Sequence, residues 1–262
     1  MIPREFQEAD PRKKAEEEVG EFKKMKLIEK NKDTIVFETQ IEDSLANALR
    51  RYVNYIPVLA VDEIEISKND SPLYDETIAH RIGLIPLKVE KSAKKEPKLK
   101  LSTNKEGMVY SKELKGEAKP VHEKIPITYI NSEQEIEFEA TTKIGLGIEH
   151  SKFSPGLMFY RNVAEITLDK ELKGKIKGLC PDNEIKERGN KITVIDNQKK
   201  EVADICESVS NDEGKKAEVE FKDDLIITVE TFGQITPEEI FKKSVDELRK
   251  DIESVSKKIE KD

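Results

Sequence analysis

The sequence predicts an α+β fold, because segments with a two-residue apolar period are mixed with segments that have a helical period. An expected strand at 34–41 places Ile35, Phe37, Thr39 and Ile41 on one face. A helical stripe follows it directly, and a longer helix is expected near the C-terminal end. The chain has 262 residues, which suits one large domain or two small ones.

The first expected helix runs from residue 44 to residue 56. Asp43 or Ser44 can cap its N-terminus, and Pro57 ends it because the residue before a proline is pushed out of the α region. The apolar stripe consists of Leu45, Ala48, Leu49, Tyr52, Val53 and Ile56. This stripe could cover a sheet built by strands 34–41 and 225–232, or it could contact a partner chain.

The second expected helix has the clearest start. Thr236 and Glu239 form a capping box, and Pro237 takes the first helical position. Apolar residues then follow at spacings of 4, 3, 4, 3 and 4: Phe241, Val245, Leu248, Ile252, Val255 and Ile259. This heptad seam is narrow, which favours contact with another helix, although packing on the chain's own sheet is the alternative.

Weaker patterns predict the remaining elements. Residues 75–85 are expected to form a short helix, and residues 191–195 and 201–205 a hairpin. Residues 88–124 contain eleven Lys and six Glu and are expected to form irregular hairpins or loops. This lysine-rich stretch could touch nucleic acid, but a solvated loop is the simpler interpretation. Strands are expected at 63–66, 135–140, 164–168, 217–221 and 225–232.

Composition excludes several classes of protein. The net charge of -8 disfavours a compact basic nucleic-acid binder. No run is long and apolar enough to cross a bilayer, and residues 1–22 form a charged arm without a signal-peptide core. We therefore expect a cytoplasmic protein with no membrane contact.

Three ordered segments carry more than a pattern. The first holds Asn47-Ala48-Leu49-Arg50-Arg51, Ile56-Pro57 and Ala79-His80-Arg81-Ile82-Gly83-Leu84-Ile85-Pro86-Leu87. The second is Gly147-Ile148-Glu149-His150-Ser151-Lys152-Phe153-Ser154-Pro155, and the third is Val229-Glu230-Thr231-Phe232-Gly233 before the capped helix. Together they resemble the α-like subunit family of DNA-directed RNA polymerase, in particular its archaeal D branch, over residues 25–260.

The resemblance implies an α-like RNA polymerase subunit fold. A discontinuous dimerisation domain would be formed by residues 23–57 and 222–262. A mainly β domain, formed by residues 58–168 and 211–221, would be inserted into it. Residues 169–210 would form a small third module, a degenerate version of the ferredoxin-like insert of the family.

The resemblance also implies a role in transcription. The chain would be a non-catalytic assembly subunit that heterodimerises with the small α-like subunit L. Small subunits N and P would join the pair, and the platform would receive the large subunits, which hold the catalytic residues. Nucleic acid would be reached only through the complex.

Two sets of residues are expected to act in assembly. The expected subunit interface is Leu45, Leu49, Arg50, Arg51, Tyr52, Ile56, Phe232, Phe241, Val245, Leu248, Ile252, Val255 and Ile259. The expected family-signature residues are Asp75, Glu76, His80, Arg81 and Gly83. A catalytic role for His80 is disfavoured, because no nucleophile and carboxylate at suggestive spacing accompany it.

The cysteine count argues against a cofactor. Some archaeal members of the family carry an iron–sulfur cluster in the third module, and a cluster needs at least three thiolates. This chain has only Cys180 and Cys206, so we expect no cluster, no zinc and two free buried thiols. An iron–sulfur redox protein and a stand-alone homodimeric regulator are the competing functional hypotheses.

Overall fold

The computed structural model describes residues 25–89 and 96–260. The charged arm expected at 1–22 lies outside the described residues. Two compact units are present: the first contains described residues 25–28 with Phe37–Glu42 and Arg161–Ile227, and the second contains Glu29–Val36, Asp43–Tyr160 and described residues from Thr228 onward. The mixed α+β class expected from the sequence is confirmed, whereas the three-part division into domains stays a prediction.

A six-stranded sheet has the order β1-β2-β14-β11-β13-β12. The expected strands at 34–41 and 225–232 are therefore neighbours in one sheet. The prediction of two separate strands at 217–221 and 225–232 was wrong, because the intervening residues include no glycine or proline and the strand continues through them. The six strands are β1 (Lys26–Lys30), β2 (Thr34–Thr39), β14 (Glu218–Thr231), β11 (Gly156–Asp169), β13 (Lys191–Asp196) and β12 (Glu184–Arg188).

The first unit has its own apolar core, formed where α4 (Lys173–Leu179) and α5 (Ala203–Asp212) pack with strands β11 and β13. The predicted hairpin of 191–195 with 201–205 was wrong, because β13 pairs with β11 and β12 instead. Buried Asp196 explains the difference. Its carboxylate accepts hydrogen bonds from Arg161 Nη2 at 2.8 Å and from the backbone N–H of Val202 at 3.0 Å, which starts a helix rather than a returning strand.

The second unit contains a four-stranded sheet in the order β3-β10-β5-β7. These strands are β3 (Val58–Asn69), β10 (Ile136–Gly145), β5 (Lys98–Thr103) and β7 (Lys115–Gly116). Strand β10 pairs antiparallel with β3 from Ile136 opposite Asn69 to Gly145 opposite Val58. Two strand pairs and one helix complete this part: β4 (Leu87–Val89) with β8 (Ala118–Pro120), β6 (Gly107–Tyr110) with β9 (Pro126–Ile130), and α3 (Asp75–Gly83).

The stretch 88–124, expected to form irregular hairpins or loops, holds the short strands β5, β6, β7 and β8 in its described part. Strand β5 buries Leu99 and Leu101 and exposes the lysines between them, so its high lysine content hides a two-residue period. Lys98 and Lys100 both pair with Glu139 on neighbouring β10, at 2.5 and 2.6 Å. Those two lysines are therefore already neutralised within the fold.

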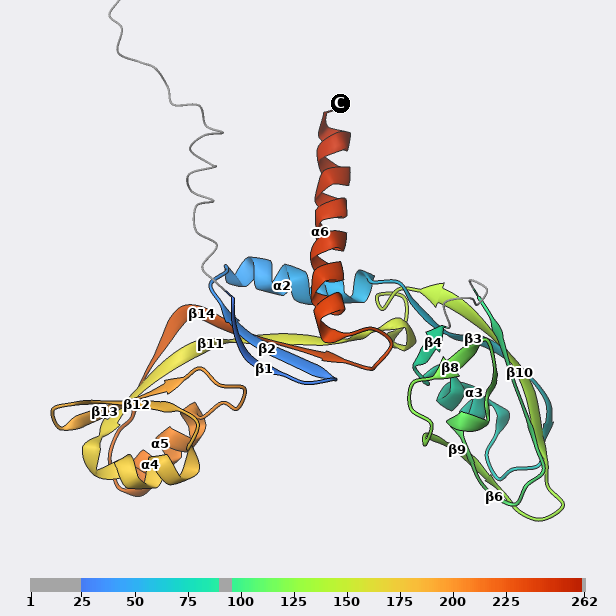
Figure 1. The fold of residues 1–262 in the computed structure, drawn as a ribbon, viewed down its shortest axis with the longest axis horizontal. Helices are drawn as coiled ribbons and strands as arrows, with labels where there is room; N and C mark the ends of the chain where they lie inside the picture. The colour runs from blue at the N-terminus through green and yellow to red at the C-terminus, as the bar shows by residue number, and fades with distance from the viewer. Residues whose placement is uncertain (1–24, 90–95, 261–262) are drawn as a thin grey trace, which may run out of the picture. The chain divides into compact units, whose positions relative to one another are not determined.

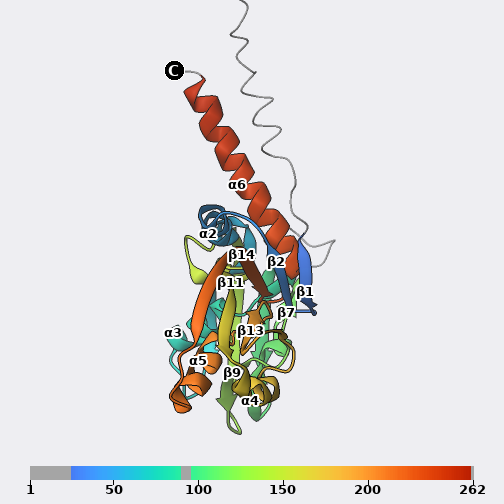
Figure 2. The same cartoon turned by 90° about the vertical axis from the view of Figure 1, so that its left-hand side faces the viewer.

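Two amphipathic helices of the second unit, α2 (Asp43–Tyr52) and α6 (Pro237–Ile259), pack against each other. A short 3-10 turn, η1 (Val53–Tyr55), follows α2. The predicted capping box of α6 is confirmed: Thr236 Oγ1 accepts from the N–H of Glu239 at 3.3 Å, and the Glu239 carboxylate accepts from the N–H of Thr236 at 3.2 Å. Figures 1 and 2 both show α6 crossing α2 and continuing beyond it. Within the described residues, no helix combines the length and apolar character needed to cross a membrane.

Candidate assembly surface

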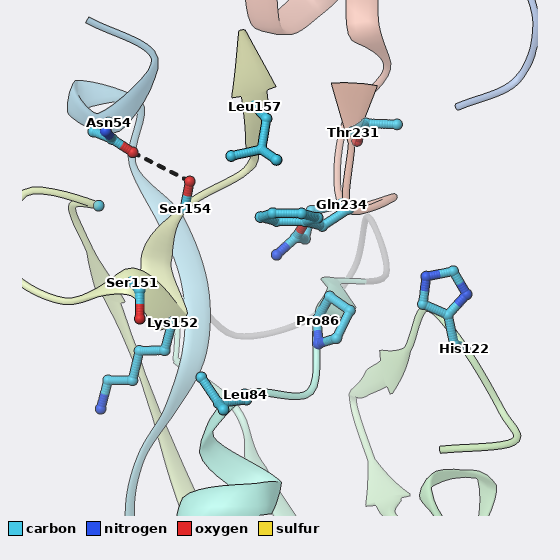
Figure 3. Close-up of a pocket in the computed structure, with 12 residues that line it drawn as sticks. Asn54, Leu84, Pro86, His122, Ser151, Lys152, Ser154, Leu157, Thr231 and Gln234 are labelled. Carbon is cyan, nitrogen blue, oxygen red and sulfur yellow. Dashed lines mark hydrogen bonds between the residues drawn. The ribbon is translucent and has the colours of Figure 1, made fainter. Parts of the chain in front are cut away.

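Three motif segments that lie far apart in the sequence meet at one cavity of the second unit, with a volume of about 640 Å³ (Figure 3). Asn54 enters from η1, Ser154 from the segment after β10, and Phe232 from the end of β14. The lining residues are Asn54, Leu84, Pro86, His122, Gly147, Ser151, Lys152, Ser154, Leu157, Thr231, Phe232 and Gln234. The motifs that resemble the α-like family thus build one surface.

Asn54 fixes the second motif segment against η1. Its backbone carbonyl accepts from the N–H of Ile148 at 3.2 Å, and its side-chain Oδ1 lies 3.2 Å from the hydroxyl of Ser154. The dashed line in Figure 3 marks the second contact. A Cβ atom on Gly147 would lie 2.7 Å from Oδ1 and 3.1 Å from Cα of Asn54, so a larger residue there would displace Asn54 from this contact.

The third motif segment is held by the end of the second. The backbone N–H of Phe232 donates to the carbonyl of Pro155 at 3.0 Å. A Cβ atom on Gly156 would lie 2.1 Å from the Glu230 carbonyl, so β11 can approach β14 only with glycine there. Gly233 has φ +97, a conformation that lets the chain turn away from β14 toward α6.

The charged groups at this cavity are paired. Lys152 Nζ lies 2.9 Å from Asp62 Oδ1, and this hydrogen bond lowers the pKa of Asp62 below its usual range. The same ammonium lies 5.0 Å from the ring centroid of Phe153, which adds a cation–π contact. Lys152 is thus held by its own chain and is not a free cation poised for catalysis.

The cavity suits binding of an apolar group. Leu84, Leu157 and Phe232 are all partly exposed around it. The Ser154 hydroxyl lies within hydrogen-bond distance of Asn54 Oδ1 and the Gly156 carbonyl, so it is not paired with a base that could activate it. The cavity therefore presents apolar side chains beside a hydroxyl that is hydrogen-bonded within the chain.

The apolar seam of α6 is uncovered along its outer half. Ile240 and Ser244 on the inner half are fully buried in the chain's own core. By contrast, Ile252 is 60% exposed and Ile259 is 71% exposed. Val245 and Val255 are also exposed, while Phe241 and Leu248 are half-buried. Ile240 and Ser244 lie beside the seam and are not part of it. The seam itself changes from half-buried positions at Phe241 and Leu248 to open surface from Ile252 onward.

The stripe of α2 is mostly internal. Leu49 is 4% exposed and Ile56 is fully buried, so these two expected interface residues offer little surface to a partner. Leu45 is exposed at the start of the helix. Tyr52 is half-buried, and its hydroxyl donates a hydrogen bond to the Asp251 carboxylate on α6, which raises the pKa of Tyr52.

The family profile of the RNA polymerase Rpb3/Rpb11 dimerisation domain matches residues 35–252. The chain belongs to this family. It is 34% identical to DNA-directed RNA polymerase subunit Rpo3 of Pyrococcus horikoshii over an alignment of 236 residues, with 84% of this chain and 91% of that protein covered. It is 28% identical to Rpo3 of Methanopyrus kandleri, with 87% of this chain and 91% of that protein covered.

Membership of the Rpb3/Rpb11 dimerisation-domain family confirms the resemblance stated from the three motif segments. The matched range contains α2, all three motifs and most of α6. The two amphipathic helices, α2 and α6, therefore lie largely within a domain that the family description calls a dimerisation domain. Which residues form the contact is not fixed by the family match, and the interface set stays a prediction.

The expected signature residues lie on or beside α3, where two of them are tied into the fold. Arg81 Nη1 donates to the Ile127 carbonyl at 2.9 Å, and Asp75 Oδ1 accepts from Asn69 Nδ2 at 2.7 Å. Glu76 and His80 are exposed, and His80 lines a smaller cleft with His150 and Lys152. Gly83 has open space around its Cα, so no close contact explains glycine there.

Arg50 and Arg51 are exposed at the end of α2. The guanidinium of Arg50 donates to Asn47 Oδ1 from Nε at 3.3 Å and from Nη2 at 2.9 Å. Because Asn47 is neutral, this contact does not neutralise the positive charge of Arg50.

Cys180 and Cys206 meet in the core of the first unit. Both are buried in the same apolar cluster, and burial raises the pKa of Cys206 to about 12. Among residues 25–89 and 96–260, no group of three or more His, Cys, Asp and Glu side chains is arranged to hold a metal ion. Two thiols are too few for an iron–sulfur cluster, which needs at least three thiolates.

Several residues of this surface were missed from the sequence. Asp251 falls outside the apolar seam, and its partner Tyr52 lies 199 positions away. Leu84 and Leu157 lie at the ends of elements beside other apolar residues, Ile85 and Met158, so no periodic pattern marked them as exposed. Asn54 carried a weak signal, because it is a polar residue just before the helix-ending Pro57.

Proposed function

We propose that this chain is a non-catalytic assembly subunit of DNA-directed RNA polymerase. It heterodimerises with the small α-like subunit, L in archaea, and the pair is joined by small subunits N and P. This platform receives the large subunits, which contain the nucleotidyltransferase residues. The chain itself contacts nucleic acid only through the complex.

The uncovered outer half of the α6 seam supports the heterodimer best. Ile252, Val255 and Ile259 follow at heptad spacing and are all exposed, although a helix of one folded domain normally buries its apolar stripe. Covering them removes apolar surface from water, which favours association by roughly 25 cal/mol per Å². A second helix with its own apolar ridge is the partner that such a narrow seam fits.

Binding between this chain and the small α-like subunit of the same organism tests the proposal. Wild-type chain should form an equimolar pair, measured by size-exclusion chromatography with light scattering. Ile252→Asp should weaken the pair by more than about 100-fold, because a charge would be buried at the centre of the seam. Ser254→Asp adds the same charge on another face of the helix and should pair normally.

The same measurement separates the competing hypotheses. A stable homodimer that ignores the small α-like subunit would support a stand-alone regulator and would contradict the heterodimer. If the Ile252→Asp variant still pairs with the small subunit, the assembly role would stand, but the outer half of the α6 seam would not be the surface that binds the partner.

We also propose that no iron–sulfur cluster or zinc is bound. The support is chemical, since Cys180 and Cys206 are the only cysteines of the chain. Metal analysis of the purified chain should give no stoichiometric iron or zinc. Stoichiometric iron would contradict this proposal and favour the redox alternative.

A further inference from the structure

Tyr52 and Asp251 join the two amphipathic helices of the second unit at a specific point. Tyr52 is the last residue of α2, and its hydroxyl donates to the Asp251 carboxylate. Asp251 is the first residue of the fully exposed end of α6, since every residue from 251 to 260 is exposed. The contact therefore sits where the packed part of α6 gives way to the free part.

The Tyr52 side chain is itself held in place. Its ring stacks on Tyr55 of η1 with centroids 4.7 Å apart and an interplanar angle of 20°. Stacking limits the ring to one orientation and so directs the hydroxyl toward α6. Tyr55 precedes buried Ile56, which anchors this turn in the core.

The position of this contact matters because the rest of α6 has no support of its own. Residues 252–259 extend about 12 Å along the helix axis at 1.5 Å per residue. They include three exposed apolar residues of the seam: Ile252, Val255 and Ile259. A small change in the tilt of α6 at the Tyr52–Asp251 contact displaces these three side chains together. Their displacement lowers the affinity for a partner, because the end of α6 must then be ordered when the partner binds.

We propose that Tyr52 is a positioning residue for the apolar seam of α6. It acts through Asp251 to set the direction in which the outer half of α6 projects. The role rests on the proposed heterodimer. It differs from the expected role of Tyr52 as a direct contact with the partner, because its hydroxyl is already used inside the chain. Tyr52 would thus raise affinity without touching the partner.

Tyr52→Phe tests the proposal, since it removes the hydroxyl and keeps the ring and its stack. The dissociation constant for the small α-like subunit should rise about fivefold, or about 1 kcal/mol, as expected for one hydrogen bond to a charged group near solvent. The melting temperature of the chain alone should stay within about 2 °C of wild type. Hydrogen exchange at residues 252–259 of the unpaired chain should become faster.

Matched variants separate positioning from a general loss of packing. Tyr55→Phe removes the neighbouring hydroxyl and should bind like wild type. Asp251→Asn keeps an acceptor oxygen for Tyr52 and should also retain affinity, whereas Asp251→Leu should match Tyr52→Phe. In the double variant Tyr52→Phe with Asp251→Leu the losses should not add, because both changes break one contact.

Unchanged affinity and hydrogen exchange in Tyr52→Phe would overturn the inference. Additive losses in the double variant would also overturn it, because they would mean that Tyr52 contacts the partner directly. Failure of the wild-type chain to bind the small subunit would instead contradict the proposed heterodimer, so the two failures are distinguishable.

Discussion

Helices α2 and α6 have similar apolar stripes, yet the fold uses them differently. In α2 and the turn after it, Leu49 and Ile56 are buried in the chain's own core. In α6, the inner residues Ile240 and Ser244 are buried, but the seam beyond Asp251 is open. The stripe of α2 therefore stabilises the monomer, whereas the outer seam of α6 is available to a partner.

The difference teaches that apolar spacing alone does not separate core from interface. Both helices repeat apolar residues every three or four positions. The two helices differ in length relative to the part of the fold that they pack on. Helix α2 has ten residues and lies over the fold, whereas α6 has 23 residues and extends beyond it. A helix that extends past its own domain exposes whatever its stripe carries there.

The largest expected effect comes from truncating the buried stripe. Leu49→Ala should lower the free energy of unfolding of the chain by about 3 kcal/mol, because it leaves a cavity in a closely packed core. Leu45→Ala is the matched control on the same helix and should cost less than about 1 kcal/mol, since Leu45 is 42% exposed. Urea denaturation followed by circular dichroism measures both. Equal losses would mean that α2 is not divided into core and surface positions.

The sequence predicts some features of α2 and α6 and leaves others open. The capping box at Thr236 and Glu239 and the heptad seam are local, so the start, length and apolar face of α6 were predictable. The burial of Leu49 was not, because the same stripe could equally have faced a partner until β2 and β14 were known to lie together. Local pattern gives the face of a helix but not what covers it.

Long-range contacts explain the remaining misses. The Tyr52 contact with Asp251 spans 199 positions and joins residues that belong to no common motif. The wrong hairpin in the first unit has a similar cause, since Asp196 is fixed by Arg161, 35 positions earlier. Periodicity cannot report such contacts, because each depends on how separate elements meet.

A substitution of Arg50 tests whether the exposed end of α2 contributes to assembly, although the apolar stripe of this helix is mostly buried in the chain's own core. Arg50→Ala should weaken joining to the large subunits about tenfold, because it removes the guanidinium donor and leaves its acceptor on the large subunit without a partner. The free energy of unfolding should change by less than about 0.5 kcal/mol. Reconstitution of the polymerase from purified subunits measures the first quantity, and Arg51→Ala provides the comparison. If both variants assemble like wild type, neither arginine reaches a large subunit.

A smaller effect is expected at the anchored end of α6. Thr236→Ala removes one half of the capping box and should cost about 1 kcal/mol of chain stability. Ser256→Ala changes a hydroxyl in the free half and should have almost no effect on unfolding. If both variants have the same stability, the inner and outer halves of α6 are not distinct in the way that burial indicates.

The smallest expected effect is a pH dependence confined to the same anchored end. Lys30 Nζ lies 2.6 Å from Glu238 Oε1, and this hydrogen bond is the main reason that the pKa of Glu238 is lowered. A carboxyl group whose pKa is lower in the folded state contributes stability that is fully present above its unfolded pKa of about 4.3 and is lost as the pH falls through the folded value. Both side chains are largely exposed, so the change should stay within about 0.5 kcal/mol.

Hydrogen exchange below pH 5, corrected for intrinsic rates, should therefore show the first turn of α6 loosening as the pH falls. In Glu238→Gln this dependence should disappear, because the side chain no longer titrates. Residues 252–259 should respond to neither change, since the Lys30–Glu238 pair lies more than three helical turns away. A pH response shared by both halves would mean that α6 moves as one rigid unit, and the contrast between its anchored and free halves would then be one of burial alone.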